Sequence, residues 1–201
     1  GNQMILVDPN HRLCRDHFAD AVASLQFVEE LDVALEGAEY TLLRSAGFSA
    51  DSGRVELEQC DLFAGLGPDD VAHLRSLMAP ADFPEGAVVC RSGEPGDALH
   101  VLTSGSLDVM LASRRGIPVR ARVASVSPGA CIGEIAVVDG SPRSADVVAV
   151  EPSQCYSLTR EAFDHLGVDR PGLYSALLRN ILLMNLERLR RNGTTFADRS
   201  D

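Results

Sequence analysis

Short apolar runs separated by turn residues fill residues 83–158, and this pattern limits the possible folds more than any other feature of the sequence. Val and Leu are frequent in runs such as "AVVC", "ALHVLTS", "SLDVMLAS" and "ADVVAV", whereas Gly and Pro are frequent between them. Apolar and polar residues alternate over 107–111 and 119–123, which is the period of a strand with one buried face. Several short strands at nearly regular spacing predict a β-sandwich, a barrel or a jelly roll.

Helical patterns lie on both sides of the predicted strands, so the expected fold is mainly β with flanking helices. Before the strands, Pro68 opens "PDDVAHLRSLM" and acidic residues follow in the first turn, as is typical of a helix start. After the strands, Thr159 can cap "REAFDHL", and Pro171 opens "GLYSALLRNILLMNLERLRRN". The first half of this last helix is apolar on more than one face, whereas a surface helix needs only one apolar stripe. We therefore expect residues 171–192 to contact their own domain and also a second copy, in a homodimer.

The first 47 residues indicate a small α/β segment that cannot form a complete domain alone. "MILV" is a short buried-strand candidate, Phe18, Val22 and Leu25 lie at helical spacing, and "ELDVALEGAEYTLL" is a second helical pattern. The residues that follow are small, polar and acidic, and they indicate a linker. The predicted parts are the partial α/β segment 1–47, the linker 48–58, the main domain 59–192 and a frayed tail 193–201.

The net charge of −11 argues against a nucleic acid as partner, because a general nucleic-acid binder needs a basic surface. The same charge means that an anionic ligand needs a concentrated local set of donors. The five cysteines and the five histidines are scattered, and their spacing indicates neither a metal site nor a disulfide framework. Since no nucleophile motif is present either, we do not expect an enzyme.

The sequence also bears on location. No apolar run approaches the ~18 residues of a membrane helix, and the first residues lack the features of a secretory signal. Scattered cysteines without a disulfide pattern fit reduced thiols in the cytoplasm. We therefore expect a cytoplasmic chain, with the cytosolic part of a membrane protein as the alternative.

Residues 131–149, "CIGEIAVVDGSPRSADVVA", place a carboxylate and an arginine on either side of a Gly-Ser-Pro turn. If residues 133–136 begin a helix, their free N–H groups point outward together and favour an anion. Arg143 supplies a planar fork suited to phosphate oxygens, and Ser144 adds a hydroxyl. Glu134 would repel a phosphate but can accept hydrogen bonds from sugar hydroxyls. Two interpretations fit this spacing: a site for a ligand with a phosphate beside a ribose, or a salt bridge between Glu134 and Arg143.

The stretch "IGEIAVVDGSPRSADVVA" resembles the phosphate-binding cassette of cyclic nucleotide-binding domains. The family pattern is Phe or Ile before Gly-Glu, a short apolar run, then Pro-Arg and two small residues. "LFAGLGPDDVAHL" resembles the helices that precede the strands in this family, and "FPEGAVVCRSGEPGDALHVLTSGSLDVML" resembles its first strands and turns. The resemblance covers about 61–192 and implies a β jelly roll, also called a double-stranded β-helix, followed by a hinged C-terminal helix.

The resemblance implies roles for individual residues of the cassette. Glu134 would accept the ribose 2′-hydroxyl, and Arg143 would pair with the cyclic phosphate. The implied ligand-lining residues are Gly133, Glu134, Ile135, Ala136, Arg143, Ser144 and Ala145. Members of the family without ligand binding also exist, so a ligand-silent dimerisation or scaffolding module of the same fold is the alternative.

The resemblance also bears on the base of the ligand. Ser144-Ala145 is similar to the Arg-Ser-Ala sequence of the bacterial catabolite activator group, which favours cAMP, whereas a Thr after the Arg favours cGMP. We therefore expect cAMP as the ligand. Because serine carries a hydroxyl as threonine does, cGMP is the second choice. In this family the residue that covers the base usually comes from the terminal helix. Asn185 and Arg188 are the polar candidates there, with ordinary exposed helix positions as the alternative.

"FVEELDVALEGAEYTLL" in the first segment resembles the closing helix of STAS domains, which are attached to sulfate-type transporters and to some bacterial glutaminases. This second resemblance implies a regulatory domain rather than a catalytic one. Such a domain would transmit the binding of its ligand through the C-terminal helix to an attached effector, such as a membrane transporter or a glutaminase.

Overall fold

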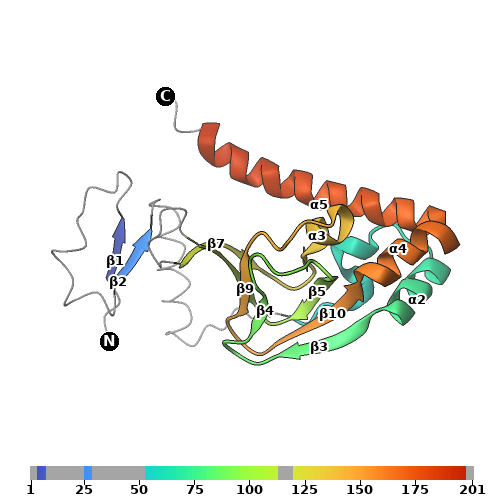
Figure 1. Cartoon of the computed structure of the whole chain (residues 1–201), viewed down its shortest axis with the longest axis horizontal. Coiled ribbons are helices and arrows are strands. Elements are labelled where there is room, and N and C mark those ends of the chain that lie inside the picture. The colour runs from blue at the N-terminus through green and yellow to red at the C-terminus, as the bar shows by residue number, and fades with distance from the viewer. Residues whose placement is uncertain (1–3, 8–24, 29–52, 113–119, 198–201) are drawn as a thin grey trace.

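The computed structural model describes residues 4–7, 25–28, 53–112 and 120–197 (Figure 1). The first two segments are strands β1 (Met4–Val7) and β2 (Leu25–Val28), which pair in parallel with Met4 opposite Leu25. β1 is the strand predicted for "MILV". β2 shows that the helix predicted through Leu25 is wrong at its end, because a short apolar run fits a strand as well as a helix and here pairs with β1. Most of the segment that resembles a STAS domain lies outside the described residues.

Two four-stranded antiparallel sheets form the centre of the main domain (Figure 1). Their strands are Ala79–Phe83 (β3), Val88–Cys90 (β4), Ala98–Ser104 (β5), Leu107–Ala112 (β6), Arg120–Val126 (β7), Cys131–Ile132 (β8), Asp146–Ala149 (β9) and Ser153–Thr159 (β10). The orders are β3-β10-β5-β8 and β4-β9-β6-β7, so strands far apart in the sequence pair with each other. This arrangement confirms the predicted β jelly roll with flanking helices.

The two sheets share one apolar core, to which strands of both contribute. Its buried members are Cys90, Leu102, Leu107, Val126, Ile132, Val147, Ala149 and Cys155. The turn between β5 and β6 depends on Gly105, whose φ is 88°. A Cβ at Gly105 would overlap the Ser153 hydroxyl and come within 2.6 Å of the Ser153 Cα, so only glycine fits there.

The flanking helices begin where the sequence predicts. They are the short helices η3 (Leu57–Gln59) and η4 (Asp61–Phe63), then α2 (Pro68–Leu77), α3 (Glu134–Asp139), α4 (Arg160–Asp169) and α5 (Pro171–Ala197). The predicted cap of α4 is confirmed, because Thr159 Oγ1 accepts the Ala162 N–H at 3.2 Å. Leu57, inside the predicted linker 48–58, is buried, and α5 extends to Ala197, whereas the division of the chain into domains stays a prediction.

α5 has two apolar faces, as its sequence predicts. One packs on the domain through Leu173, Leu177, Ile181 and Met184. The other carries Leu182, Leu183 and Leu189, whose exposed fractions are 58%, 45% and 66%. The Phe163 ring of α4 lies 5.0 Å from the Tyr174 ring and joins α4 to α5.

A buried amide fixes the middle of α5. Asn180 Nδ2 donates to the carbonyl oxygens of Leu62 and Ala64, both at 2.9 Å. These carbonyls belong to η4 and to the residue that ends it. Asn180 is 6% exposed, so its hydrogen bonds are protected from water and hold this part of α5 firmly against η4.

Candidate functional site

The predicted cassette folds around α3, which follows β8 directly. Gly133 caps the start of α3 with a φ of 73°, in the left-handed region that favours glycine. A Cβ at Gly133 would overlap Arg143 Nη1, so the absence of a side chain lets the two ends of the cassette approach each other. The predicted helical start in residues 133–136 is therefore confirmed.

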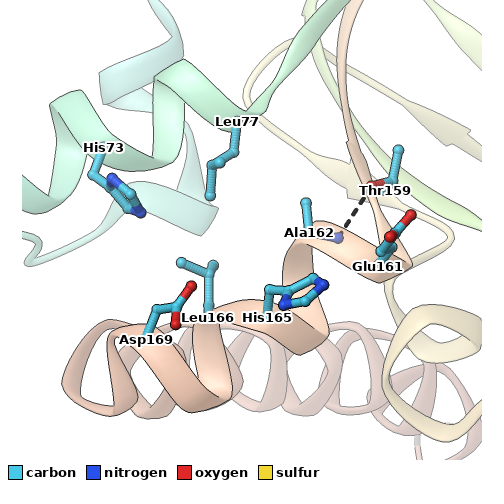
Figure 2. A pocket seen from close by; sticks show the side chains of 8 residues that line it. All are labelled: His73, Leu77, Thr159, Glu161, Ala162, His165, Leu166 and Asp169. Atoms are coloured by element: carbon cyan, nitrogen blue, oxygen red, sulfur yellow. Dashed lines mark hydrogen bonds between the residues drawn. The ribbon is translucent and has the colours of Figure 1, made fainter.

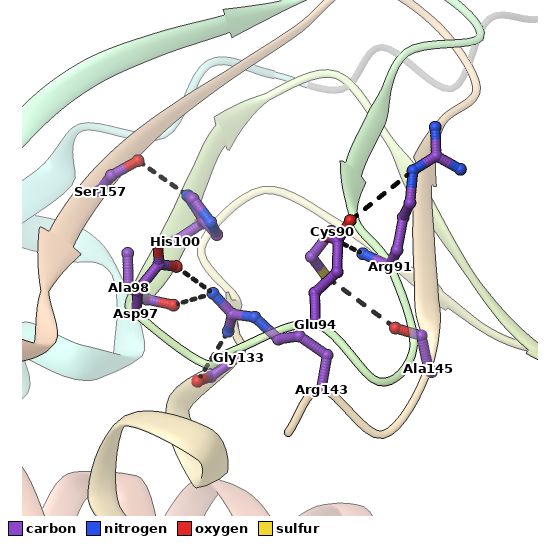
Figure 3. Close-up of polar contacts among 10 residues, drawn as sticks. All are labelled: Cys90, Arg91, Glu94, Asp97, Ala98, His100, Gly133, Arg143, Ala145 and Ser157. Atoms are coloured by element: carbon purple, nitrogen blue, oxygen red, sulfur yellow. Dashed lines mark hydrogen bonds and ion pairs between the residues drawn. The ribbon is translucent and has the colours of Figure 1, made fainter. Parts of the chain in front are cut away.

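The Arg143 guanidinium lies between three groups from distant parts of the chain (Figure 3). Nη1 donates to the Gly133 carbonyl at 3.2 Å, and Nη2 donates to the Ala98 carbonyl at 2.5 Å. Nη2 also lies 3.5 Å from the Asp97 carboxylate. Arg143 is 5% exposed, whereas the Asp97 side chain is 86% exposed. Within the part of the chain that the structure describes, the carboxylate that pairs with this buried cation is thus one that water screens strongly.

The backbone of Arg143 is fixed as firmly as its side chain. Its N–H donates to the Glu94 carbonyl, its own carbonyl accepts the Gly93 N–H, and both distances are 2.8 Å. Glu94 and Gly93 belong to the turn between β4 and β5. This turn therefore determines where the arginine side chain enters the site.

The Glu134 carboxylate points to the terminal helix. Its Oε1 accepts a hydrogen bond from Arg188 Nη1 at 2.6 Å, and Arg188 Nη2 donates to the Cys131 carbonyl. Glu134 is 2% exposed. Glu134 and Arg143 thus have different partners, and the salt bridge between them that the spacing allowed is not the arrangement seen.

The other predicted site residues fall into two groups. Ala136 and Ala145 are buried beside the cassette, at 5% and 8% exposure. Ile135 is 53% exposed, and Ser144 is exposed as well. Each of these four residues lies within two positions of Glu134 or Arg143 in the sequence. Their contacts to a ligand stay a prediction.

The two base-cap candidates differ in the structure. Asn185 Nδ2 donates to the Ile181 carbonyl of its own helix at 2.9 Å, as an ordinary helix position would. Arg188 is not an ordinary exposed position, because it reaches the buried Glu134. Sequence reasoning missed this contact, and it missed Asp97 and Ala98 as partners of Arg143. No local spacing links residues 45 or 54 positions apart, so only the fold reveals these pairs.

His100 lies in β5 beside this site and stays neutral at neutral pH (Figure 3). Burial, followed by the nearby Arg143 charge, lowers the pKa of His100 from 6.5 to about 4, and Asp97 opposes the shift. Its Nδ1 lies 2.7 Å from the Ser157 hydroxyl. His100 therefore adds no positive charge beside Arg143 at neutral pH.

The buried thiols are also neutral. Burial raises the pKa of Cys60 to about 11 and that of Cys155 to about 12. Burial, and then the charge of Glu134, raises the pKa of Cys131 as well. Among the residues that the structure describes, these thiols are packing groups of the core.

A separate cavity of about 350 Å³ lies between α2 and α4 (Figure 2). Its lining residues are His73, Leu77, Thr159, Glu161, Ala162, His165, Leu166 and Asp169. None of the predicted site residues lines this cavity. At the cassette, in contrast, Asp97 pairs with Arg143 and Arg188 pairs with Glu134. A ligand there would have to replace these protein groups.

No helix within the described ranges 53–112 and 120–197 is both long and apolar enough to cross a membrane.

Fold and site together define a class of protein. A jelly roll that holds a buried arginine and a buried glutamate at the two ends of one cassette, with the glutamate tied to a terminal helix, is the arrangement of a ligand-sensing regulatory domain. Comparison with known families identifies it further: residues 80–168 match the "Cyclic nucleotide-binding domain" family. This part of the chain is a cyclic nucleotide-binding domain.

Three similar proteins illustrate the relationship. The "CRP-like cAMP-activated global transcriptional regulator" of Mycobacterium tuberculosis is 31% identical over 143 residues, which are 71% of this chain and 61% of that protein. "Glutaminase 1" of Bradyrhizobium diazoefficiens is 30% identical over 160 residues, which are 79% of this chain and 25% of that protein. The crystal structure of a cyclic nucleotide-binding domain from Methylobacillus flagellatus is 28% identical, with a TM-score of 0.63 over 69% of this chain and 77% of that one. The chain thus spans less than two thirds of either curated relative.

Proposed function

We propose that this domain binds cAMP in preference to cGMP and that α5 carries the signal of occupancy to an attached effector. The observation that carries this proposal is the pair of buried, separately held groups, Arg143 and Glu134, at the two ends of one cassette. The name of the mycobacterial relative, a cAMP-activated regulator, supports cAMP as the ligand.

The phosphate end is Arg143. Its present carboxylate neighbour, Asp97, is 3.5 Å away and mostly exposed, so a ligand phosphate can take its place at little cost. A buried guanidinium pairs strongly with phosphate, because the hydrogen bonds are charge-assisted and two can form side by side. Ser144 supplies a further hydroxyl near this end. This concentrated set of donors explains how a chain with a net charge of −11 can hold an anion.

The ribose end is Glu134, and this end is connected to α5. Arg188 Nη1 donates to Glu134 Oε1, and we propose that a ribose 2′-hydroxyl displaces it there. Binding then releases Arg188, while Asn180 keeps the middle of α5 on η4. Once released, Arg188 remains next to the site and, with Asn185 one turn before it, is available to cover the base.

Isothermal titration calorimetry tests the ligand. We expect saturable heat with cAMP and weaker binding with cGMP, because Arg143-Ser144-Ala145 resembles the sequence of the bacterial catabolite activator group, which favours cAMP. Absence of heat with both nucleotides would overturn the proposal in favour of a ligand-silent module of the same fold.

The effector is proposed from the first segment of the chain. The match to the glutaminase covers 79% of this chain, which exceeds the share that residues 53–201 represent, so it takes in part of the first segment. The parallel pair β1–β2 fits the α/β segment that resembles a STAS domain. We therefore propose a glutaminase or a transporter as the attached effector, and the cytoplasm as the compartment, because reduced buried thiols persist there.

We also propose that α5 forms a homodimer through its outer face. Leu182 and Leu189 lie about two turns apart on this face and are more than half exposed, which favours a helix-to-helix contact. The double change Leu182→Asp and Leu189→Asp is expected to give monomers in sedimentation velocity, because two carboxylates cannot be buried unpaired. Val168→Asp is the matched control, since Val168 is 81% exposed on α4. A wild-type chain that sediments as a monomer would contradict the dimer.

A further inference from the structure

Arg160, the first residue of α4, contacts residue 97 through its backbone N–H and the end of α3 through its side chain. Its N–H donates to the Asp97 carbonyl at 2.7 Å. Its guanidinium lies over Gly140, since a Cβ at Gly140 would be 2.7 Å from Arg160 Nη1 and 2.9 Å from Nη2. Gly140 ends α3 with a φ of 74°, and its N–H donates to the Ala136 carbonyl. One residue therefore spans from the neighbour of Arg143 to the end of the helix that carries Glu134.

The charge of Arg160 suits its place. The last carbonyls of a helix have no partner within the helix and favour a nearby cation. Around the guanidinium stand Asp139 at the end of α3 and Asp164, whose carboxylate lies 3.6 Å from Arg160 Nε. Hydrogen bonds from Ser141 lower the pKa of Asp139, and the Arg160 charge acts in the same direction. Two carboxylates thus lie near the Arg160 guanidinium, and its side chain is 44% exposed.

The position of α3 matters for the ligand, because Glu134 is its first residue. The position of residues 97–98 matters equally, because Asp97 and the Ala98 carbonyl hold Arg143. We propose that Arg160 is a positioning residue for cyclic nucleotide binding. It fixes α3 relative to residues 97–98, so that Glu134 and Arg143 are the right distance apart for the ribose and the phosphate. This inference rests on the proposed function, and the side chain acts through Glu134 without touching the ligand.

The test compares Arg160→Gln with Arg170→Gln. Arg170 is the matched control: it lies at the other end of α4, pairs with Asp70 at 3.2 Å, and its side chain is 42% exposed against 44% for Arg160. Calorimetry is done with cAMP and with 2′-deoxy-cAMP, which lacks the hydroxyl that Glu134 would accept. Arg160→Gln is expected to weaken cAMP binding about fivefold and 2′-deoxy-cAMP binding less than about twofold. The effect of Arg160 depends on the 2′-hydroxyl, because Arg160 acts through Glu134. Arg160→Lys, which keeps the charge, should restore most of the loss.

Several outcomes separate the two proposals. If wild type binds neither nucleotide, the proposed function fails and the role of Arg160 fails with it. If wild type binds cAMP but Arg160→Gln behaves as Arg170→Gln does, only the role of Arg160 is overturned. Equal losses for both nucleotides would also overturn it, because a general loss of structure does not distinguish the ribose. Thermal melting without ligand shows whether each variant is folded, and Arg160→Met, which removes the charge but keeps an unbranched side chain, replaces Arg160→Gln in the comparison if Arg160→Gln is not folded.

Discussion

Arg143→Ala is expected to weaken cAMP binding at least tenfold. The change removes the buried cation at the phosphate end, and hydrogen bonds to charged groups contribute about 1.5–3 kcal/mol each. His100 does not supply a cation in its place, because its pKa is lowered to about 4 and this imidazole is neutral at pH 7. Isothermal titration calorimetry of wild type and variant at one salt concentration measures the difference.

Two controls make this result specific. Arg91→Ala removes an arginine from the turn between β4 and β5, 54% exposed and 3.9 Å from Glu94, and should leave cAMP affinity unchanged. Arg143 also donates to the Gly133 and Ala98 carbonyls, so thermal melting of the ligand-free variant is needed to show that it is folded. A folded Arg143→Ala variant that binds cAMP as wild type does would contradict a phosphate site at this residue.

Arg188→Ala is expected to act in the opposite direction and to tighten cAMP binding about tenfold. The variant leaves Glu134, which is 2% exposed, without the donor it has in the ligand-free protein. An unsatisfied buried carboxylate costs about 1–3 kcal/mol, and a ribose hydroxyl would then supply the missing donor. The ligand-free variant should accordingly melt at a lower temperature, and cAMP should raise its melting temperature more than that of wild type.

Arg179→Ala is the control for this change, since Arg179 is an exposed arginine on the same helix. We expect it to leave both affinity and melting temperature unchanged. Weaker cAMP binding by Arg188→Ala would contradict competition for Glu134 and would favour Arg188 as a cap over the base.

The sequence predicted those features that depend on local spacing. Strand alternation, the start of α2 at Pro68, the Thr159 cap and the cassette around Gly133 all appear in the structure. Each of them is specified by residues a few positions apart, through backbone conformation or through a hydrogen bond to the nearest turn. The family resemblance then assigned the two ends of the ligand.

The contacts that tie the site to the rest of the domain could not be predicted in this way. Asn180 meets η4 across 118 residues, and Arg188 meets Glu134 across 54. In the sequence, both are polar residues of a helix that carries other polar residues as well, and they look like surface positions. Burial in the folded domain gives them their partners, and periodicity alone does not show which face of a two-faced helix will be covered.

The two attachments of α5 differ in a way that has a mechanical consequence. Asn180 holds the helix to η4 through backbone carbonyls, and Arg188 holds it to the ligand site about 12 Å further along, at 1.5 Å per residue. Ala197 lies about 25 Å from Asn180 by the same measure. With Asn180 as the pivot of a rigid lever, a given displacement at Arg188 becomes about twice as large at Ala197. A small rearrangement of one carboxylate at the ribose end would thereby be amplified at the far end of the helix.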